Sequence, residues 1–123
     1  VSTNAPDTDL VVRLTDVGPD GRSNLIQEGA LRLRYRNGFD APELMQPDQV
    51  YRAEVSLRHI AYRVKTGHKL RLHVAGSSFP RLARNMNTGG DPYSESAPQV
   101  AQITLHSGAG AESYVELFTL PTP

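Results

Sequence analysis

The first residues to weigh for chemistry are two adjacent serines, because a hydroxyl beside a base can act as a nucleophile. Ser77 and Ser78 lie in Gly76-Ser77-Ser78-Phe79-Pro80, directly after a predicted strand. This segment is superficially similar to a Gly-x-Ser-x-Gly nucleophile elbow, whose last glycine lets the following helix pack closely on the strand. Pro80 stands at that position here, and no amphipathic helix follows. We therefore expect a structural loop, and a small hydrolase using Ser77 or Ser78 is the less favoured alternative.

The histidines are the next candidates, as metal ligands or general bases. The sequence contains four of them, His59, His68, His73 and His106, and no cysteine. No two histidines have the spacing of a His-x-His or His-x-x-x-His pair, and no carboxylate stands at a matching distance. Metal binding and acid–base catalysis both need convergent partners. We expect no metal site, no cofactor and no catalytic residue in this chain.

Two charged motifs allow either a binding role or a structural one. Asp7-Thr8-Asp9 could start a calcium site, but no other acidic cluster is near, so we expect its side chains to hold a turn at the entry of a strand. Arg32, Arg34 and Arg36 could bind an anionic partner, or they could be solvated or paired with a neighbouring strand. Thirteen basic and thirteen acidic residues give a net charge of zero. That balance argues against nucleic acid or an anionic membrane as the partner and favours the second interpretation of the arginines.

The elements that must position these residues are strands, because apolar and polar residues alternate with a period of two. Each alternating segment has one apolar and one polar face, which is typical of half-buried antiparallel sheets. The expected strands are Asp9–Val17, Leu31–Arg36, Tyr51–Leu57, Ile60–Lys65, Lys69–Val74, Ala101–His106 and Tyr114–Leu120. The expected turns are Gly18-Pro19-Asp20-Gly21, Lys65–His68 and Gly108–Gly110, with Pro19, Asp20 and Gly21 as the structural turn residues of the first. We predict an all-β, jelly-roll-like antiparallel sandwich that forms a single domain over residues 1–123.

Two longer connections separate the strands. Residues 37–49 contain two prolines and no alternation, which indicates a surface crossover. Residues 76–99 form a loop of unusual length, and such loops are usually functional or disordered. Phe79, Leu82, Met86 and Tyr93 offer apolar anchors, so we predict an ordered loop. No apolar run approaches the ~20 residues of a membrane span, and we expect no membrane partner. Many exported bacterial proteins also lack cysteine, so the compartment stays open between cytoplasm and secretion.

Two stretches of the chain are similar to a known family. The first is Asp7–Arg22 followed by Gly29–Arg36, and the second is Gly67–Arg81 followed by Asn85–Gly90. Together they resemble the C-terminal, non-catalytic domain of the X-Pro dipeptidyl-peptidase and cocaine esterase group of serine hydrolases, to which glutaryl-type cephalosporin acylases and α-amino acid ester hydrolases also belong. The similarity covers the chain from about Ser2 to Gly90.

The resemblance implies a jelly-roll sandwich and an upstream α/β-hydrolase domain, as the partner in the same parent protein, that carries a Ser-His-Asp triad. In that family the sandwich begins with strands that precede Val1, so we expect this chain to be a fragment whose first strands are missing. The parent would hydrolyse acyl esters, amides or X-Pro peptides, and the chain alone would hydrolyse nothing. The sequence leaves the choice among these substrates, and homo-oligomer formation through the parent, open.

The resemblance also indicates where the domain would contact its partner. We predict that it packs on the catalytic domain and shapes the active-site rim through the loop after residue 76. The candidate contact residues are Phe79, Pro80, Arg81, Asn85, Asn87, Thr88 and Gly89, and the structural turn residues include Asp7 and Asp9. The alternative is that these groups only brace the loop internally. A free-standing carbohydrate- or ligand-binding sandwich is the alternative function, although the chain contains no tryptophan for sugar stacking.

Overall fold

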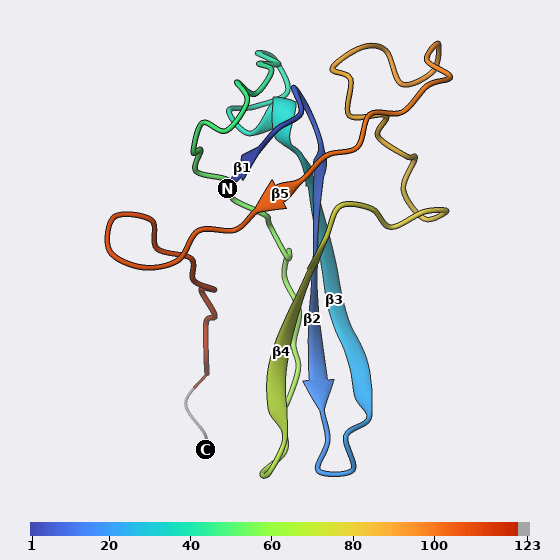
Figure 1. Cartoon of the computed structure of the whole chain (residues 1–123). Coiled ribbons are helices and arrows are strands. Elements are labelled where there is room, and N and C mark those ends of the chain that lie inside the picture. Colours follow the sequence, from blue (N-terminus) through green and yellow to red (C-terminus); the bar gives the residue numbers. More distant parts are fainter. Residues whose placement is uncertain (121–123) are drawn as a thin grey trace.

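A three-stranded antiparallel sheet is the main element of the computed structural model, which describes residues 1–120 (Figure 1). Strands β2 (Asp9–Val17), β3 (Ser23–Arg32) and β4 (Lys69–Ala75) are arranged in the order β3-β2-β4. The central strand β2 is buried along most of its length on both faces, which explains why its sequence alternates less cleanly than its neighbours. The all-β, antiparallel sandwich fold predicted from the sequence is confirmed.

The hairpin between β2 and β3 closes through the predicted turn. The amide of Gly21 donates to the carbonyl of Gly18 at 2.9 Å, and the amide of Gly18 donates to that of Arg22 at 2.9 Å. Gly21 has a φ of 80°, a conformation that costs glycine little. Pro19 and Asp20 lie between them, and the Asp20 carboxylate accepts the Arg22 amide. These residues set the register in which β3 returns along β2.

A second, short ladder lies at one end of the sheet. Strand β1 (Ser2–Thr3) pairs with β5 (Ile103–Thr104), so the start of the chain is tied to a segment a hundred residues later. A cluster of buried apolar side chains, Leu10, Leu33 and Met45, lies beside this ladder, and Val1 and Ile103 pack against it. Met45 belongs to the connection 37–49, which is therefore not only a surface crossover as predicted. Its amide donates to the carbonyl of Pro6, and this bond holds the connection against the core.

Two predicted strands, Tyr51–Leu57 and Ile60–Lys65, are extended but join no ladder within residues 1–120. The first alternates between half-buried and exposed side chains, as the sequence pattern required. The whole extended segment 51–65 crosses the sheet. The Ser56 carbonyl lies against Gly29 of β3, and the Tyr62 hydroxyl donates to Asp16 of β2. The prediction of paired strands is wrong here: Tyr51 exchanges two backbone hydrogen bonds with Val1, but no described strand continues this pairing along the segment.

Three other predicted strands need correction. Leu31–Arg36 is strand only to Arg32, and η1 (Leu33–Tyr35) is a 3₁₀ turn. Ala101–His106 is reduced to the two residues of β5, and Tyr114–Leu120 is unpaired. The turns at 65–68 and 108–110 do form, each through one backbone hydrogen bond. They connect extended segments rather than the arms of a ladder.

The predicted apolar anchors of the loop 76–99 do not all hold it. Leu82 and Met86 are partly buried, whereas Phe79 and Tyr93 are 63% and 92% exposed. Polar contacts described below hold the loop instead. Within residues 1–120, no helix is long and apolar enough to cross a membrane.

Candidate functional site

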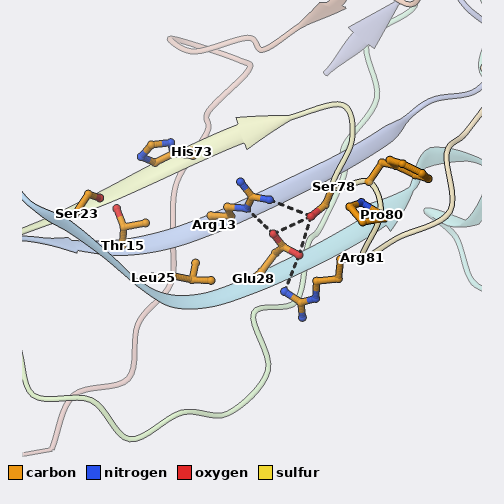
Figure 2. Close-up of a pocket in the computed structure, with 10 residues that line it drawn as sticks. Arg13, Thr15, Ser23, Leu25, Glu28, His73, Ser78, Pro80 and Arg81 are labelled. Atoms are coloured by element: carbon orange, nitrogen blue, oxygen red, sulfur yellow. Dashed lines mark hydrogen bonds and ion pairs between the residues drawn. The ribbon is translucent and has the colours of Figure 1, made fainter.

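The loop 76–99 is fastened to the sheet at two places, and each place is built around buried carboxylates. The first, which we call the Glu28 clamp, contains Glu28 of β3, Arg13 of β2, and Ser78 and Arg81 of the loop. Arg13 and Glu28 are cross-strand partners, so their side chains lie on the same face of the sheet. Figure 2 shows all four side chains converging there.

The Glu28 carboxylate is saturated by donors. Arg13 donates from Nε at 2.5 Å, Arg81 donates from Nη1 at 2.7 Å, and the Ser78 hydroxyl contacts both carboxylate oxygens at 3.2 and 3.3 Å. Ser78 in turn accepts Nη2 of Arg13 at 2.9 Å. The hydrogen bond from Arg13, together with those from Ser78 and the charge of Arg81, lowers the pKa of Glu28 in spite of its burial. The carboxylate therefore stays ionised and holds the loop to the sheet.

The second place, the Asp7–Asp9 clamp, fastens the far part of the loop. Asn85 is buried and donates from Nδ2 to Asp7 at 2.9 Å and to Asp9 at 2.8 Å. Arg34 donates to Asp7 through its backbone amide at 2.9 Å and through Nε at 2.7 Å, and Arg32 donates to Asp9 through Nε at 2.9 Å. The loop, the entry of β2 and the end of β3 therefore meet at two carboxylates.

This cluster changes how Asp7 and Asp9 must be understood. They hold no Asx turn of their own, because their oxygens are used by groups from distant parts of the chain. By accepting the Arg34 amide, Asp7 draws the backbone out of β3 and into the 3₁₀ turn that follows. The hydrogen bond to Asp9 raises the pKa of Arg32 above its usual value.

The same contacts decide between the two interpretations of the charged motifs. The arginines of the predicted stripe are paired one by one, Arg32 with Asp9, Arg34 with Asp7 and Arg36 with Glu43. Guanidinium groups occupy the positions that a calcium ion would need at both aspartates. Among residues 1–120, no group of three or more metal-ligating side chains could hold a metal ion.

The remaining candidate contact residues have different surroundings, and two of them, Asn87 and Thr88, are hydrogen-bonded within the loop. Asn87 has a φ of 64° and donates from Nδ2 to the Gln99 carbonyl at 2.8 Å, and its backbone amide donates to Oδ1 of Asn85 at 2.9 Å. Thr88 is hydrogen-bonded to Glu95. Gly89 has a φ of 82° and lies against Leu44. Pro80 follows Phe79 through a cis peptide bond, and both lie on the outer surface of the loop.

Comparison with known proteins explains this combination of motifs. The family model for the X-Pro dipeptidyl-peptidase C-terminal non-catalytic domain matches residues 1–116. The chain belongs to this family.

A curated relative and a solved structure agree with the family assignment. The non-catalytic domain is 32% identical over 119 residues to cocaine esterase from Rhodococcus sp. (strain MB1 Bresler), a match that covers 95% of this chain and 21% of that protein. It also resembles the crystal structure of an aminopeptidase from the marine sediment archaeon Thaumarchaeota archaeon, with a TM-score of 0.71 and 28% identity over 81% of this chain and 18% of that one. The chain therefore spans about a fifth of the length of these relatives.

Two contacts of single histidines in the non-catalytic domain, one with a serine and one with an aspartate, were not predicted from the sequence. Ser2 and His106 are hydrogen-bonded at 2.9 Å between Oγ and Nε2, across the ladder of β1 and β5. His68 donates from Nδ1 to Asp16 at 2.8 Å, and Tyr62 donates to the same carboxylate at 2.7 Å. The pairs belong to opposite ends of the sheet, and within residues 1–120 no serine, histidine and acid form one connected triad.

The cluster at Asp16 has a structural role that its surroundings explain. The hydrogen bond from Tyr62, followed by the contact with His68 and the charge of Lys65, lowers the pKa of Asp16, and the same hydrogen bond raises the pKa of Tyr62. The cluster ties the extended segment 51–65 to the end of β2. Its sequence signal is weak, because the partners are separated by 46 and 52 residues.

The serines suggested as alternative nucleophiles are placed unfavourably for that role. Ser78 is buried and donates to Glu28 rather than to a histidine. The hydroxyl of Ser77 accepts the Phe79 amide. The Glu28 clamp was not predicted from the sequence. The opposite charges of Arg13 and Glu28 are a signal for it, but they can be recognised as partners only when the hairpin register is known.

Proposed function

We propose that this domain packs against the α/β-hydrolase catalytic domain of its parent protein and shapes the rim of the active site. The parent would be a serine hydrolase with dipeptidyl-peptidase, esterase or acylase activity, and the names of the family and of the curated relative agree with the first two. The proposal assigns the chemistry to the parent and the shape of the entrance to the non-catalytic domain.

The observation that carries the proposal is the construction of the loop 76–99. Its inner side is fixed by buried groups, Ser78 on Glu28 and Asn85 on both aspartates. Its outer side presents Phe79, which is 63% exposed, and the Arg81 side chain, which is 60% exposed. A rigidly held loop with an exposed aromatic and an exposed guanidinium is typical of a contact surface.

Unpaired extended segments support a second part of the proposal, that polypeptide outside these 123 residues completes the sandwich. Strand edges without partners are a liability that folded proteins normally cover. The segment 51–65, strand β4 and the segment 114–120 all present half-exposed apolar side chains. These are Ile60, Tyr62, Val64, Leu70, Leu72, Val74, Val115 and Leu117. Further strands of the parent would cover them.

Kinetics of the full-length parent test the contact role of the loop. In the Phe79→Ala and Arg81→Ala variants, we expect kcat/KM to fall by about 10-fold to 100-fold, because a displaced rim misplaces the substrate. Phe39→Ala is the matched control, since Phe39 is an exposed aromatic outside the loop. Unchanged thermal stability and unchanged turnover of the Arg81→Ala variant would remove any contact role for this residue.

A further inference from the structure

A hollow of about 380 Å³ lies between the loop 76–99 and the extended segment 51–65. Its walls include two arginines from different parts of the chain, Arg58 and Arg81, and its floor is formed at Gly29, where β3 passes close to the backbone of Ser56. This hollow adjoins the larger pocket of Figure 2, and Glu28 and Arg81 line both.

Arg81 is held in a position that leaves its binding edge open. Its Nη1 is fixed on Glu28 at 2.7 Å, and Figure 2 shows Arg13 and Arg81 approaching that carboxylate from different sides. Within residues 1–120, neither Nε nor Nη2 of Arg81 has a hydrogen-bond partner. These two N–H groups form the planar fork that binds both oxygens of a carboxylate.

The local charge favours an anion in the hollow. Arg13 and Arg81 share the single negative charge of Glu28, so the Glu28 clamp is left with one excess positive charge. Arg58 adds a second, and among the described residues its guanidinium forms no ion pair. The backbone of Arg58 adopts a φ of 58°, which is uncommon for a residue other than glycine, and its amide is held by the Ser56 hydroxyl.

We propose that this hollow binds a carboxylate, with the Nε–Nη2 edge of Arg81 as a bidentate donor and Arg58 as the second cation. The inference rests on the proposed function in one respect, because an Asp or Glu side chain of the catalytic domain is the first source of this carboxylate. A free carboxylic acid is the other source. In both cases the bound group joins the loop to the segment 51–65.

Carbodiimide coupling in the full-length parent tests the proposal. The reagent activates a carboxylate, which then forms an amide most readily with an amine beside it, and the carbodiimide leaves with the carboxylate oxygen as a urea. The variants are Arg81→Lys and Arg58→Lys, which each place an amine at the hollow and keep the positive charge. Arg22→Lys is the control, since Arg22 is exposed at the β2–β3 turn; coupling to Asp20, the ion-pair partner of Arg22, is excluded from the comparison. Each variant is treated with and without sodium acetate, and coupled peptides are identified by mass spectrometry.

Two results support the proposal and identify the source. Coupling of both positions to the same Asp or Glu outside these 123 residues shows a side chain of the parent in the hollow. Acetylation of positions 58 and 81 that is about tenfold greater than acetylation of position 22 shows a site for a free carboxylate. Binding would produce this difference by raising the local concentration of acetate at the hollow.

Two results overturn it. One is coupling at position 81 to Glu28 alone, and the other is coupling at both positions no greater than at position 22. The kinetic effects of Phe79→Ala would be unaffected by this failure, so the loss of the carboxylate site is distinguishable from the loss of the interdomain contact.

Discussion

At the scale of single residues, the domain depends on carboxylates that are buried together with their cationic partners. Asp7 is fully buried and Glu28 nearly so, yet both form ion pairs with arginines. Removing one member of such a group leaves the others buried and uncompensated, which costs more than the group contributes when intact. The motif residues Asp7, Arg34 and Asn85 therefore act as one unit.

Substitution of Asp7 tests this unit. In the Asp7→Asn variant, Arg34 loses its anionic partner, and we expect the free energy of opening at β2 to fall by about 3–5 kcal/mol. Hydrogen exchange of β2 peptides in the parent protein measures that free energy. Asp20→Asn is the control, because Asp20 is exposed at a turn, and it should change the value by less than about 0.5 kcal/mol. Equal effects of the two substitutions would contradict the account.

The hold of Glu28 on the loop should depend on pH. Because its pKa is lowered in the folded state, ionised Glu28 contributes stability that is fully present above the ordinary value of 4.5 and is lost as the pH falls through the folded value. We expect hydrogen exchange of residues 77–82, corrected for its intrinsic rate, to become faster only below about pH 4.5. In the Glu28→Gln variant this acid-dependent step should disappear. An identical acid response in both proteins would show that Glu28 does not hold the loop.

At the scale of elements, the extended segment 51–65 is packed on the sheet without belonging to it. Gly29 makes this possible, because β3 passes against the Ser56 carbonyl at a distance that leaves no room for a side chain. Tyr62 fixes the other end of the segment on Asp16. The segment therefore forms a second layer. It is held at Gly29 by steric contact, at Tyr62 by a hydrogen bond to Asp16, and at Tyr51 by two backbone hydrogen bonds with Val1.

Gly29→Ala tests the first contact. A Cβ at this position would overlap the backbone of Ser56, which cannot move away as a flexible side chain would, and overpacking of this kind costs about 1–3 kcal/mol. We expect faster hydrogen exchange in both β3 and the segment 51–65. Gly76→Ala is the matched control, because its Cβ would lie 3.3 Å from the end of the flexible Ile103 side chain and at an ordinary contact distance of 3.9 Å from the Asp9 carbonyl oxygen. A silent Gly29→Ala variant would show that the two layers are not in contact.

The sequence predicted the class of fold and the alternating faces, because period-two patterns are local. It did not predict which alternating segments pair, since a ladder needs a partner at the right edge, and Tyr51–Leu57 has none within residues 1–120. The motif residues Asp7, Arg81 and Asn85 were found in the sequence, but their partners were not. The contacts of Asn85 with Asp7 and Asp9 join residues 78 and 76 positions apart, and no local pattern records such a distance.

At the scale of the whole molecule, the fold presents one long loop at the end of a narrow sheet, close to the ladder of β1 and β5 (Figure 1). The two clamps hold the inner side of that loop on the sheet. Among residues 1–120, the segments 51–65 and 114–120 join no ladder, and β4 has a strand partner on one side alone. Both features fit a domain that is completed and covered by other parts of a larger hydrolase. The loop is where the non-catalytic domain would affect catalysis.

The most direct test of this account is photo-crosslinking from the tip of the loop. Phe79 is replaced by p-benzoylphenylalanine in the full-length parent, the protein is irradiated, and the crosslinked peptides are identified by mass spectrometry. The account predicts crosslinks to the α/β-hydrolase domain, and few from the same analogue at Phe39, which is 83% exposed outside the loop. Crosslinks confined to these 123 residues, or equal from both positions, would contradict it.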